Sequence, residues 1–479
     1  MHLLDGLPLA LELAAARLAL LTPAQLRDRL RASPDVLTDA GAGRLDRHRS
    51  LEATVDWTLR MLEDAPRALF MRLGAFAGPV ELEELEGVAG VDGLDVFEAL
   101  AGLLDVALVR RVESGDGHVR FALPEALRQI AARRLDAAPD GSAWRHAHAQ
   151  RQTEIVWAAR WLCQAAGADY RAAMAADAEA DAALRWARAH GDPLAAPLGA
   201  AHAGLLADVG RMREAFALLE PILATPSGDP VLDSHALLMQ GYALLCAERM
   251  DEALAFVARA LAIAADPMTR SWAFLIRGLV HTFSDELAAG VRDSEQATAL
   301  APRSDAAFFS GVLAIEAQAR LFAGDVDGAA RLDAEAERIG APVDTQVLLF
   351  RDTYDGDLAM RTGRPHDALE HFARSLEAAQ SLGNRQVLLD LRAAAHALAE
   401  LGEDADALEM VGLAEAQAAD MFGAEAAPTL GLPGPYHLVA AEARVGAAAA
   451  AELKARGRAV PPGGRIVRAC QLARAHEPA

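Results

Sequence analysis

Apolar residues recur at helical spacing along most of the chain. One stripe of apolar residues, three or four positions apart on a single helical face, consists of Leu51, Val55, Leu59 and Leu62. The spacing changes over residues 105–123, where two short apolar runs flank the turn sequence Ser114-Gly-Asp-Gly. These runs predict the two strands of a β-hairpin. Helices followed by a hairpin predict a small winged-helix module.

Local signals place several helix boundaries. Thr22 and Gln25 flank Pro23 in the pattern of a capping box, which predicts that a helix begins there. Asp64 is expected to cap a further helix. Pro124 is expected to open a helix directly after the hairpin, because a proline loses no hydrogen bond in the first turn.

A repeat occupies the second half of the chain. Small residues recur with a period of 37–39 residues, at Ala203, Gly241, Gly278, Ala317, Gly356 and Ala395. A second small residue follows each of them twelve positions later, and turn-like sequence lies between the two. Small residues allow two helices to approach closely, and the turn reverses the chain. The pattern predicts about six helix–turn–helix units of the tetratricopeptide (TPR) type.

Composition agrees with a mostly helical chain and limits its partners. Of the 479 residues, 53% are hydrophobic but only 5% are aromatic, and this favours closely packed helices. The net charge of −22 disfavours nucleic-acid phosphates and an anionic membrane surface. The three cysteines form no metal-ligand spacing, and no apolar stretch is long enough to cross a membrane. We therefore expect a cytoplasmic protein without a signal peptide.

The sequence offers few candidates for catalysis or metal binding. Lys454 is the only lysine, and it lies in an Ala-rich stretch, so the chain has no P-loop lysine that follows glycines. His146 and His148 are two positions apart and would not share a helical face, so we interpret them as surface histidines. Acidic pairs such as Glu83 and Glu84 are interpreted as solvated helix faces. We expect no enzyme activity, no catalytic residue and no metal site in this chain.

Several short motifs carry a resemblance to a known family. In chain order they are Gly6-Leu7-Pro8-Leu9, Arg47-His-Arg-Ser-Leu, Leu73-Gly-Ala-Phe-Ala-Gly and Arg120-Phe-Ala-Leu-Pro-Glu. In order and spacing they resemble the STAND-class signal-transduction ATPases, an NB-ARC-like group of nucleotide-operated switches, and above all the bacterial transcriptional regulators among them. The chain resembles the C-terminal part of such a regulator, with the GLPL helix, a winged helix and TPR repeats but without the P-loop.

The resemblance implies roles for three residues near the start of the chain. In the family, the proline of the GLPL element packs against the adenine, so Gly6, Leu7 and Pro8 are weak candidates for nucleotide binding. Because phosphate-binding partners are missing, we favour a packing role for Pro8. ATP or ADP is expected only where a complete ATPase module is present. The resemblance also implies that the winged helix closes over the nucleotide, so we expect no direct binding of nucleic acid.

The motifs and the repeat divide the chain into five parts. These are a remnant of an NB-ARC-like ATPase module (1–46), a winged-helix-like domain (47–138), a helical linker (139–200), the TPR-like solenoid (201–422), and a loop with C-terminal helices (423–479). We expect a regulatory arm that binds a protein or small-molecule signal through the concave face of its repeats. Two alternatives are a free-standing TPR scaffold without nucleotide dependence and a switch that takes its P-loop from another chain.

Overall fold

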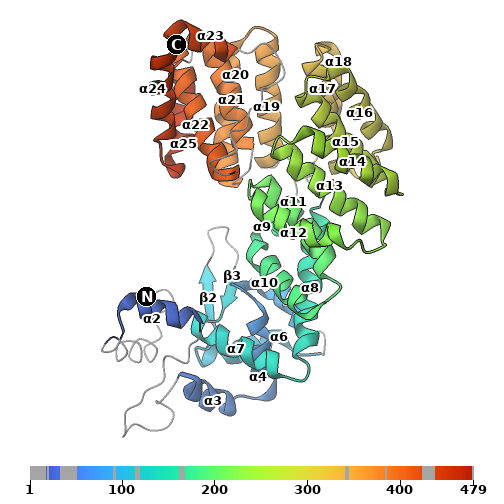
Figure 1. Cartoon of the computed structure of the whole chain (residues 1–479). Helices are drawn as coiled ribbons and strands as arrows, with labels where there is room; N and C mark the ends of the chain where they lie inside the picture. The colour runs from blue at the N-terminus through green and yellow to red at the C-terminus, as the bar shows by residue number, and fades with distance from the viewer. Residues whose placement is uncertain are drawn as a thin grey trace. The chain divides into compact units, whose positions relative to one another are not determined.

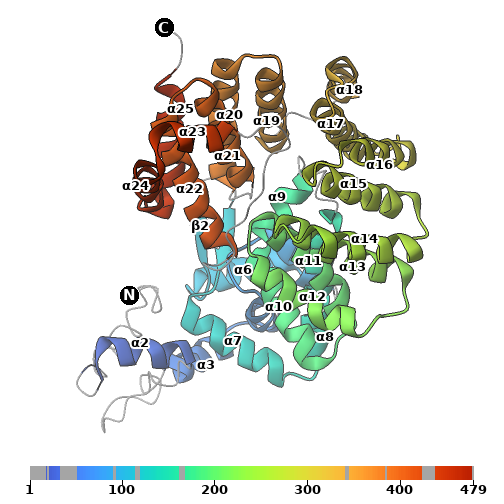
Figure 2. The same ribbon diagram turned by 45° about the horizontal axis from the view of Figure 1, so that its top comes forward.

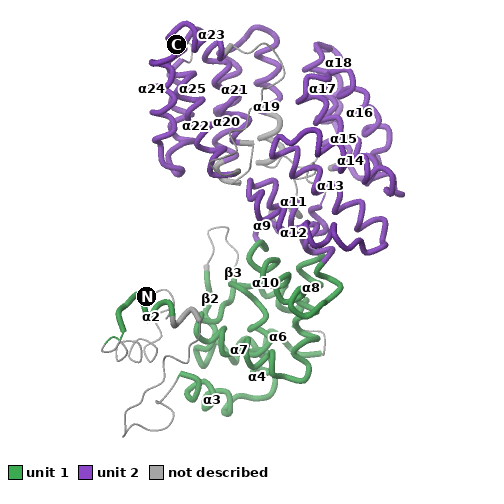
Figure 3. Tube along the Cα trace, in the orientation of Figure 1, with its two compact units in different colours: residues 1–154, 176–195 green, residues 155–175, 196–479 purple. Residues whose placement is uncertain are grey.

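The computed structural model is mostly α-helical. It describes residue 18 and residues 21–32, 51–89, 93–113, 119–160, 168–339, 345–382, 386–422 and 437–476. The chain divides into two compact units (Figure 3). The first unit comprises residues 1–154 and 176–195, and the second comprises residues 155–175 and 196–479.

The first unit contains a winged helix built on a three-stranded sheet (Figure 1). Its first helices are α2 (Pro23–Ala32), α3 (Leu51–Met61), α4 (Asp64–Arg72), α5 (Leu82–Ala89), α6 (Val96–Asp105) and α7 (Glu125–Ala137). The antiparallel strands, in the spatial order β1-β3-β2, are β1 (Val80–Glu81), β2 (Arg110–Glu113) and β3 (Val119–Ala122). In this register, both Val80 and Arg111 lie opposite Phe121. The predicted winged-helix module with a short hairpin is therefore confirmed.

The starts of two helices test the capping predictions. The capping box is confirmed, because the Gln25 N–H donates to Thr22 Oγ1 at 3.3 Å and the Thr22 N–H donates to Gln25 Oε1 at 3.0 Å. The prediction for α4 is wrong by one residue. Its N-cap is Glu63, and Asp64 is the first residue of the helix. A carboxylate in the first turn still interacts favourably with the positive end of the helix dipole.

The hairpin is shorter than the apolar run that predicts it. The first strand begins at Arg110, because Ala107 has a φ of 56° and turns the chain after α6. Pro124 is the N-cap residue of α7, so the predicted helix follows the hairpin directly. The sequence does not predict β1, since a strand of two residues is too short to show an alternating pattern.

In the core of the first unit, the segment after α4 packs against α7. The largest fully buried side chains here include Phe70, Phe76 and Ile130. Between them lies η4 (Leu73–Ala75), a single 3-10 turn. A Cβ added at Gly74 would lie 2.4 Å from the backbone nitrogen of Ala132, so only glycine permits this approach.

Two further helices complete the first unit, namely the first part of α8 (Gly141–Ala158) and α10 (Asp177–His190). Glu179 on α10 accepts hydrogen bonds from the backbone N–H groups of Ala77 at 2.8 Å and Gly78 at 2.7 Å. His148 on α8 contacts the same carboxylate through Nε2 at 3.1 Å. The loop after η4 is thus held by side chains from both helices.

The two histidines on α8 have different environments. His148 is 1% exposed and packs edge-on against Phe76, with the ring centroids 4.9 Å apart. The interpretation of His148 as a surface residue is therefore wrong, because its ring fills the space between the winged helix and α10. His146 is partly exposed, and its Nδ1 lies 2.7 Å from a carboxylate oxygen of Asp192.

The second unit is a helical solenoid (Figure 2). Its helices follow one another in pairs joined by short turns. The pairs are α11 (Ala195–Asp208) with α12 (Met212–Ala224), α13 (Pro230–Cys246) with α14 (Met250–Ile263), α15 (Pro267–Phe283) with α16 (Leu287–Leu300), α17 (Ala306–Phe322) with α18 (Val326–Ile339), α19 (Thr345–Arg361) with α20 (Pro365–Leu382), and α21 (Gln386–Glu400) with α22 (Asp404–Phe422). The predicted TPR-like solenoid is confirmed.

The small residues lie where the two helices of a pair touch. At Gly241 an added Cβ would lie 2.9 Å from a methyl carbon of Val257, and at Gly356 it would lie 2.4 Å from the ring of Phe372. At Gly278 it would lie 3.2 Å from the carbonyl oxygen of Gly290, its partner twelve residues later. Larger side chains at these positions would separate the helices, and this close approach explains the period of the sequence.

The six turns within the pairs share one hydrogen-bonding pattern. Each contains one residue with φ between 63° and 87°, and these residues are Gly210, Glu248, Asp285, Gly324, Gly363 and Gly402. The N–H of the residue that follows donates to the carbonyl five positions earlier, as from Arg211 to Leu206 at 2.8 Å. This is the Schellman motif, which satisfies the last carbonyls of the first helix.

The remaining described helices of the second unit lie before and after the repeats. They are α9 (Ala168–Ala175), α23 (His437–Val445), α24 (Ala447–Arg458) and α25 (Arg465–Arg474), with a short 3-10 turn, η6 (Pro462–Gly464), before α25. Lys454 lies on α24 and forms an ion pair with Glu442. Among the helices that the structure describes, none has the length and apolar character needed to cross a bilayer.

Candidate functional site

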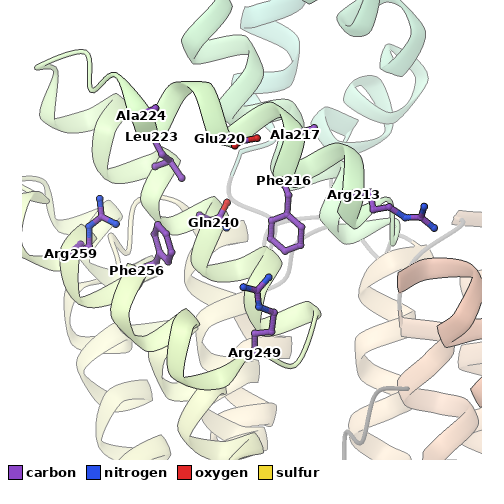
Figure 4. Close-up of a pocket in the computed structure, with 10 residues that line it drawn as sticks. All are labelled: Arg213, Phe216, Ala217, Glu220, Leu223, Ala224, Gln240, Arg249, Phe256 and Arg259. Carbon is purple, nitrogen blue, oxygen red and sulfur yellow. The ribbon is translucent and has the colours of Figure 1, made fainter. Parts of the chain in front are cut away.

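A groove of about 650 Å³ lies between α12 and α14, the second helices of the first two repeat pairs (Figure 4). Its lining combines charged, aromatic and small side chains. The lining residues are Arg213, Phe216, Ala217, Glu220, Leu223, Ala224, Gln240, Arg249, Phe256 and Arg259. Gln240 comes from α13, and the other residues come from α12, α14 and the turn before α14.

The hollow follows from the sequence of α12. Arg213, Ala217, Glu220 and Ala224 recur at spacings of four, three and four residues, so they lie on one face of the helix. The two alanines leave room between the longer side chains. Pro221 lies inside the same helix and has no N–H, so it cannot donate to the carbonyl of Ala217.

Two phenylalanine rings supply the apolar part of the groove. Phe216 and Phe256 are both partly buried. The Arg249 guanidinium carbon lies 5.9 Å from the centroid of the Phe216 ring, and that of Arg259 lies 4.9 Å from the Phe256 ring. A guanidinium at these distances is attracted to the ring face, which holds both rings beside a positive charge.

The charges of the groove contrast with those of the chain as a whole. The lining contains three arginines and one glutamate, Glu220, whereas the chain carries a net charge of −22. Arg249 forms a two-pronged ion pair with Glu252, at 2.6 Å for each contact. In the part of the chain that the structure describes, Arg213 and Arg259 have no carboxylate partner. The groove therefore presents two guanidinium groups whose charge is not offset by an ion pair.

A second polar cluster lies on the fifth repeat pair but already has its own cation. Asp352, Asp355 and His371 place one ligand atom each within 4.8 Å of one another. Arg374 contacts Asp352 Oδ1 at 2.8 Å. Burial tends to raise the pKa of Asp352, but hydrogen bonds from His371 and Arg374 keep it below its ordinary value. The guanidinium also lies 2.6 Å from His371 Nδ1, so it contacts two of the three residues, and we interpret the cluster as an ion-pair network.

The winged helix has an acidic helix at the position that reads DNA in helix-turn-helix proteins. This helix, α6, begins after the N-cap Asp95, contains Glu98 and Asp105, and has no lysine or arginine. Its side chain Phe97 is 61% exposed. Acidic side chains repel phosphates, so this helix lacks the basic residues that contact the DNA backbone in other proteins.

The site residues predicted from the sequence are not those that line the groove. Gly6, Leu7 and Pro8 lie outside the described residues. The groove residues were not predicted, because α12 and α14 become neighbours only in the folded repeats. A weak signal exists in the sequence: Arg213 with Phe216 and Phe256 with Arg259 each place an arginine three residues from an aromatic ring on an exposed helix.

A comparison with protein families identifies one segment of the first unit. Residues 62–136 match the model of the winged helix-turn-helix domain family. This segment is a winged helix-turn-helix domain. The match extends from the residues before α4 to the end of α7 and includes the sheet. It supports the resemblance to bacterial STAND-class regulators that the motifs at residues 73–78 and 120–125 carry.

Curated relatives of this winged-helix chain are mycobacterial. A Mycobacterium tuberculosis protein named as an HTH-type transcriptional regulator is 31% identical over 195 residues, which cover 39% of this chain and 22% of the relative. An uncharacterized Mycobacterium bovis protein is 33% identical over 146 residues, which cover 29% of this chain and 36% of the relative. The chain thus spans about a fifth to a third of the length of these relatives.

A solved structure is similar at a greater distance. It is a STAND protein with a tetratricopeptide repeat sensor from Pyrococcus horikoshii, with a TM-score of 0.46 and 13% identity. The likeness covers 94% of this chain and 74% of that one.

Proposed function

We propose that the chain is the signal-sensing, regulatory arm of a STAND-type transcriptional regulator. The observation that carries the proposal is the presence of a winged helix-turn-helix domain and a TPR-like solenoid in one polypeptide. The name of the mycobacterial regulator supports a role in transcription. The repeats would bind a protein or small-molecule signal, and the winged helix would transmit it to a nucleotide-binding module.

In this proposal the winged helix contacts protein rather than DNA. The acidic character of α6 supports this role, since its exposed side chains include Phe97 and Glu98 but no basic residue. The arm itself would bind no nucleotide and catalyse no reaction. Its only lysine, Lys454, pairs with Glu442 on α23 and follows no glycine-rich loop. ATP or ADP would enter only through a complete ATPase module.

Transcript levels in the source cells test the regulatory role. We would compare cells that carry the unaltered gene with cells that lack residues 201–422 and with cells that carry Gly278→Leu, which should separate α15 from α16. The proposal expects the same set of transcripts to change in both altered strains. Unchanged transcripts in the strain that lacks the repeats would contradict it.

A free-standing interaction scaffold is the second candidate. The groove between α12 and α14 favours it, because a protein could bind there without any nucleotide. Affinity purification with and without ADP separates the two functions. A partner recovered equally well in both conditions, together with unchanged transcripts, would favour the scaffold. Micromolar binding of ADP to the isolated chain would instead favour a switch completed by another chain.

A further inference from the structure

We propose that the groove between α12 and α14 binds an acidic peptide segment of a partner protein, with an apolar side chain of that segment seated between Phe216 and Phe256. The inference rests on the proposed signal-binding role of the repeats and specifies where and what they bind. Two features of the groove carry it: its charge and its two phenylalanine rings.

The charge determines the sign of the ligand. Arg213 and Arg259 have no carboxylate partner among the described residues, and both side chains are exposed at the groove. Other arginines of the solenoid are paired, as Arg211 is with Glu214 and Arg364 is with Asp367. A partner carboxylate would form charge-assisted hydrogen bonds with a guanidinium, and these are about twice as strong as neutral ones.

The phenylalanine rings require that the ligand also carry an apolar side chain. Phe216 and Phe256 are only partly buried, so each exposes apolar surface in the groove. An aliphatic or aromatic side chain that covers this surface would gain about 25 cal/mol for each Å² removed from water. The guanidinium groups over the two rings would flank that side chain. The groove therefore selects for acidic residues next to an apolar one.

Gln240 supplies a contact that favours a peptide. Its side-chain amide, another part of the groove lining, offers both a donor and an acceptor to a peptide backbone. A simple anion could use only the donor.

The groove suits a segment of a protein better than the alternatives. Most of its lining side chains are exposed, so it would leave a small ligand largely in water, unlike the enclosed pockets that small molecules prefer. A nucleic acid would meet the overall charge of −22 around this small basic area. A peptide with two or three carboxylates carries fewer charges and can follow the helix.

A peptide selection tests the inference on the full chain. A random 12-residue library displayed on phage would be selected on the wild-type chain and depleted on the double variant Arg213→Glu with Arg259→Glu. We expect the recovered peptides to be rich in Asp and Glu around a Phe, Leu or Trp. Binding of labelled peptides, followed by fluorescence anisotropy, should weaken at least about tenfold in the double variant. It should also weaken as salt rises.

Two further variants complete the test. Ala217→Trp would fill the groove without a change of charge, and it should abolish binding. Arg292→Glu, the same type of charge reversal at one arginine on the exposed face of α16, should leave the affinity unchanged. Peptides without acidic enrichment, no peptide that survives depletion, or tighter binding of an oligonucleotide would overturn the inference. The proposed regulatory function would survive these outcomes if transcripts still depend on the repeats.

Discussion

Glu179 and Gly78 are joined by a 2.7 Å hydrogen bond, although 100 residues separate them in the chain. The same carboxylate accepts a hydrogen bond from Ala77 and contacts His148. Glu179 is 8% exposed, whereas Ala77 and Gly78 are partly buried. A single side chain therefore connects α10 and α8 with the loop that follows η4.

The first prediction concerns this carboxylate. Glu179→Ala should destabilise the first unit by about 2 kcal/mol, because two partly buried N–H groups would lose a charged acceptor. Hydrogen exchange of the segment 73–78, followed by mass spectrometry, should become faster. Glu154→Ala is the matched control, since the contacts of Glu154 with Arg151 and Gln150 are exposed and should matter little. Equal exchange in both variants would show that Glu179 does not hold the loop.

Two glycines of the winged helix should respond to alanine in opposite ways. At Gly74 the new Cβ would lie 2.4 Å from backbone atoms of α7, so Gly74→Ala should lower the free energy of unfolding by 3 kcal/mol or more, on the order of other overpacked cores. At Gly87, inside α5, nothing lies within 4 Å of the added carbon. Gly87→Ala should stabilise by up to about 1 kcal/mol, because alanine favours the helix. Denaturant unfolding of both variants measures the difference.

If Gly74→Ala lowered the free energy of unfolding no more than Gly87→Ala does, this result would contradict the close approach of η4 to α7. The winged helix would then have room at a point where the structure places two backbones in contact. Loss of stability in Gly87→Ala would instead indicate a neighbour for α5 outside the described residues.

The sequence predicts the parts of the fold that depend on local pattern. The pair Gly278 and Gly290 is visible because its spacing recurs in every repeat, and the capping box at Thr22 because its two partners are three residues apart. The contact between Glu179 and Ala77 has no such pattern. It forms only when α10 packs on the winged helix, and no spacing in the sequence predicts it.

The same limit applies to the candidate site. The groove needs Phe216 from one repeat and Phe256 from the next, and neither residue shows from its neighbours that a hollow lies beside it. The candidate site residues that the family resemblance predicts are instead Gly6, Leu7 and Pro8. These residues lie outside the described part of the chain, so their role stays a prediction.

Two repeat turns carry a side chain where the other four have glycine. Asp285 and Glu248 both have a φ of 63°, a conformation that costs residues with a Cβ about 1–2 kcal/mol. Asp285 is exposed, so Asp285→Gly should raise stability by about 1 kcal/mol. Glu248 contacts Arg392 at 3.2 Å, with both side chains largely buried. Glu248→Gly should therefore destabilise, by about 3 kcal/mol, since it removes the carboxylate from a buried pair.

Thermal unfolding of the two variants decides this prediction. Opposite shifts of the unfolding temperature would support an ion pair that compensates for the strain at Glu248. Shifts in the same direction would show that the backbone conformation alone controls both turns. The double variant of Glu248→Gly with Arg392→Met should recover part of the loss, because no buried charge would remain.

Asp357 on α19 should make the stability of the solenoid depend on pH. Burial raises its pKa to about 7, against the opposing effects of a hydrogen bond from Gln318 on α17 and the charge of Arg361. The folded chain thus binds a proton that the unfolded chain releases near pH 4. The stabilising contribution of this proton is complete below pH 4 and is lost as the pH rises to about 7.

Asp357→Asn keeps the size of the side chain and removes its titration. We expect the variant to unfold at a higher temperature than the wild type at pH 8 and to show a smaller loss of stability between pH 5 and pH 8. Glu370→Gln on α20 removes an exposed carboxylate and should leave the pH dependence unchanged. If Asp357→Asn kept the wild-type pH profile, the carboxyl would be ionised in the folded repeats, with Arg361 as its counter-charge.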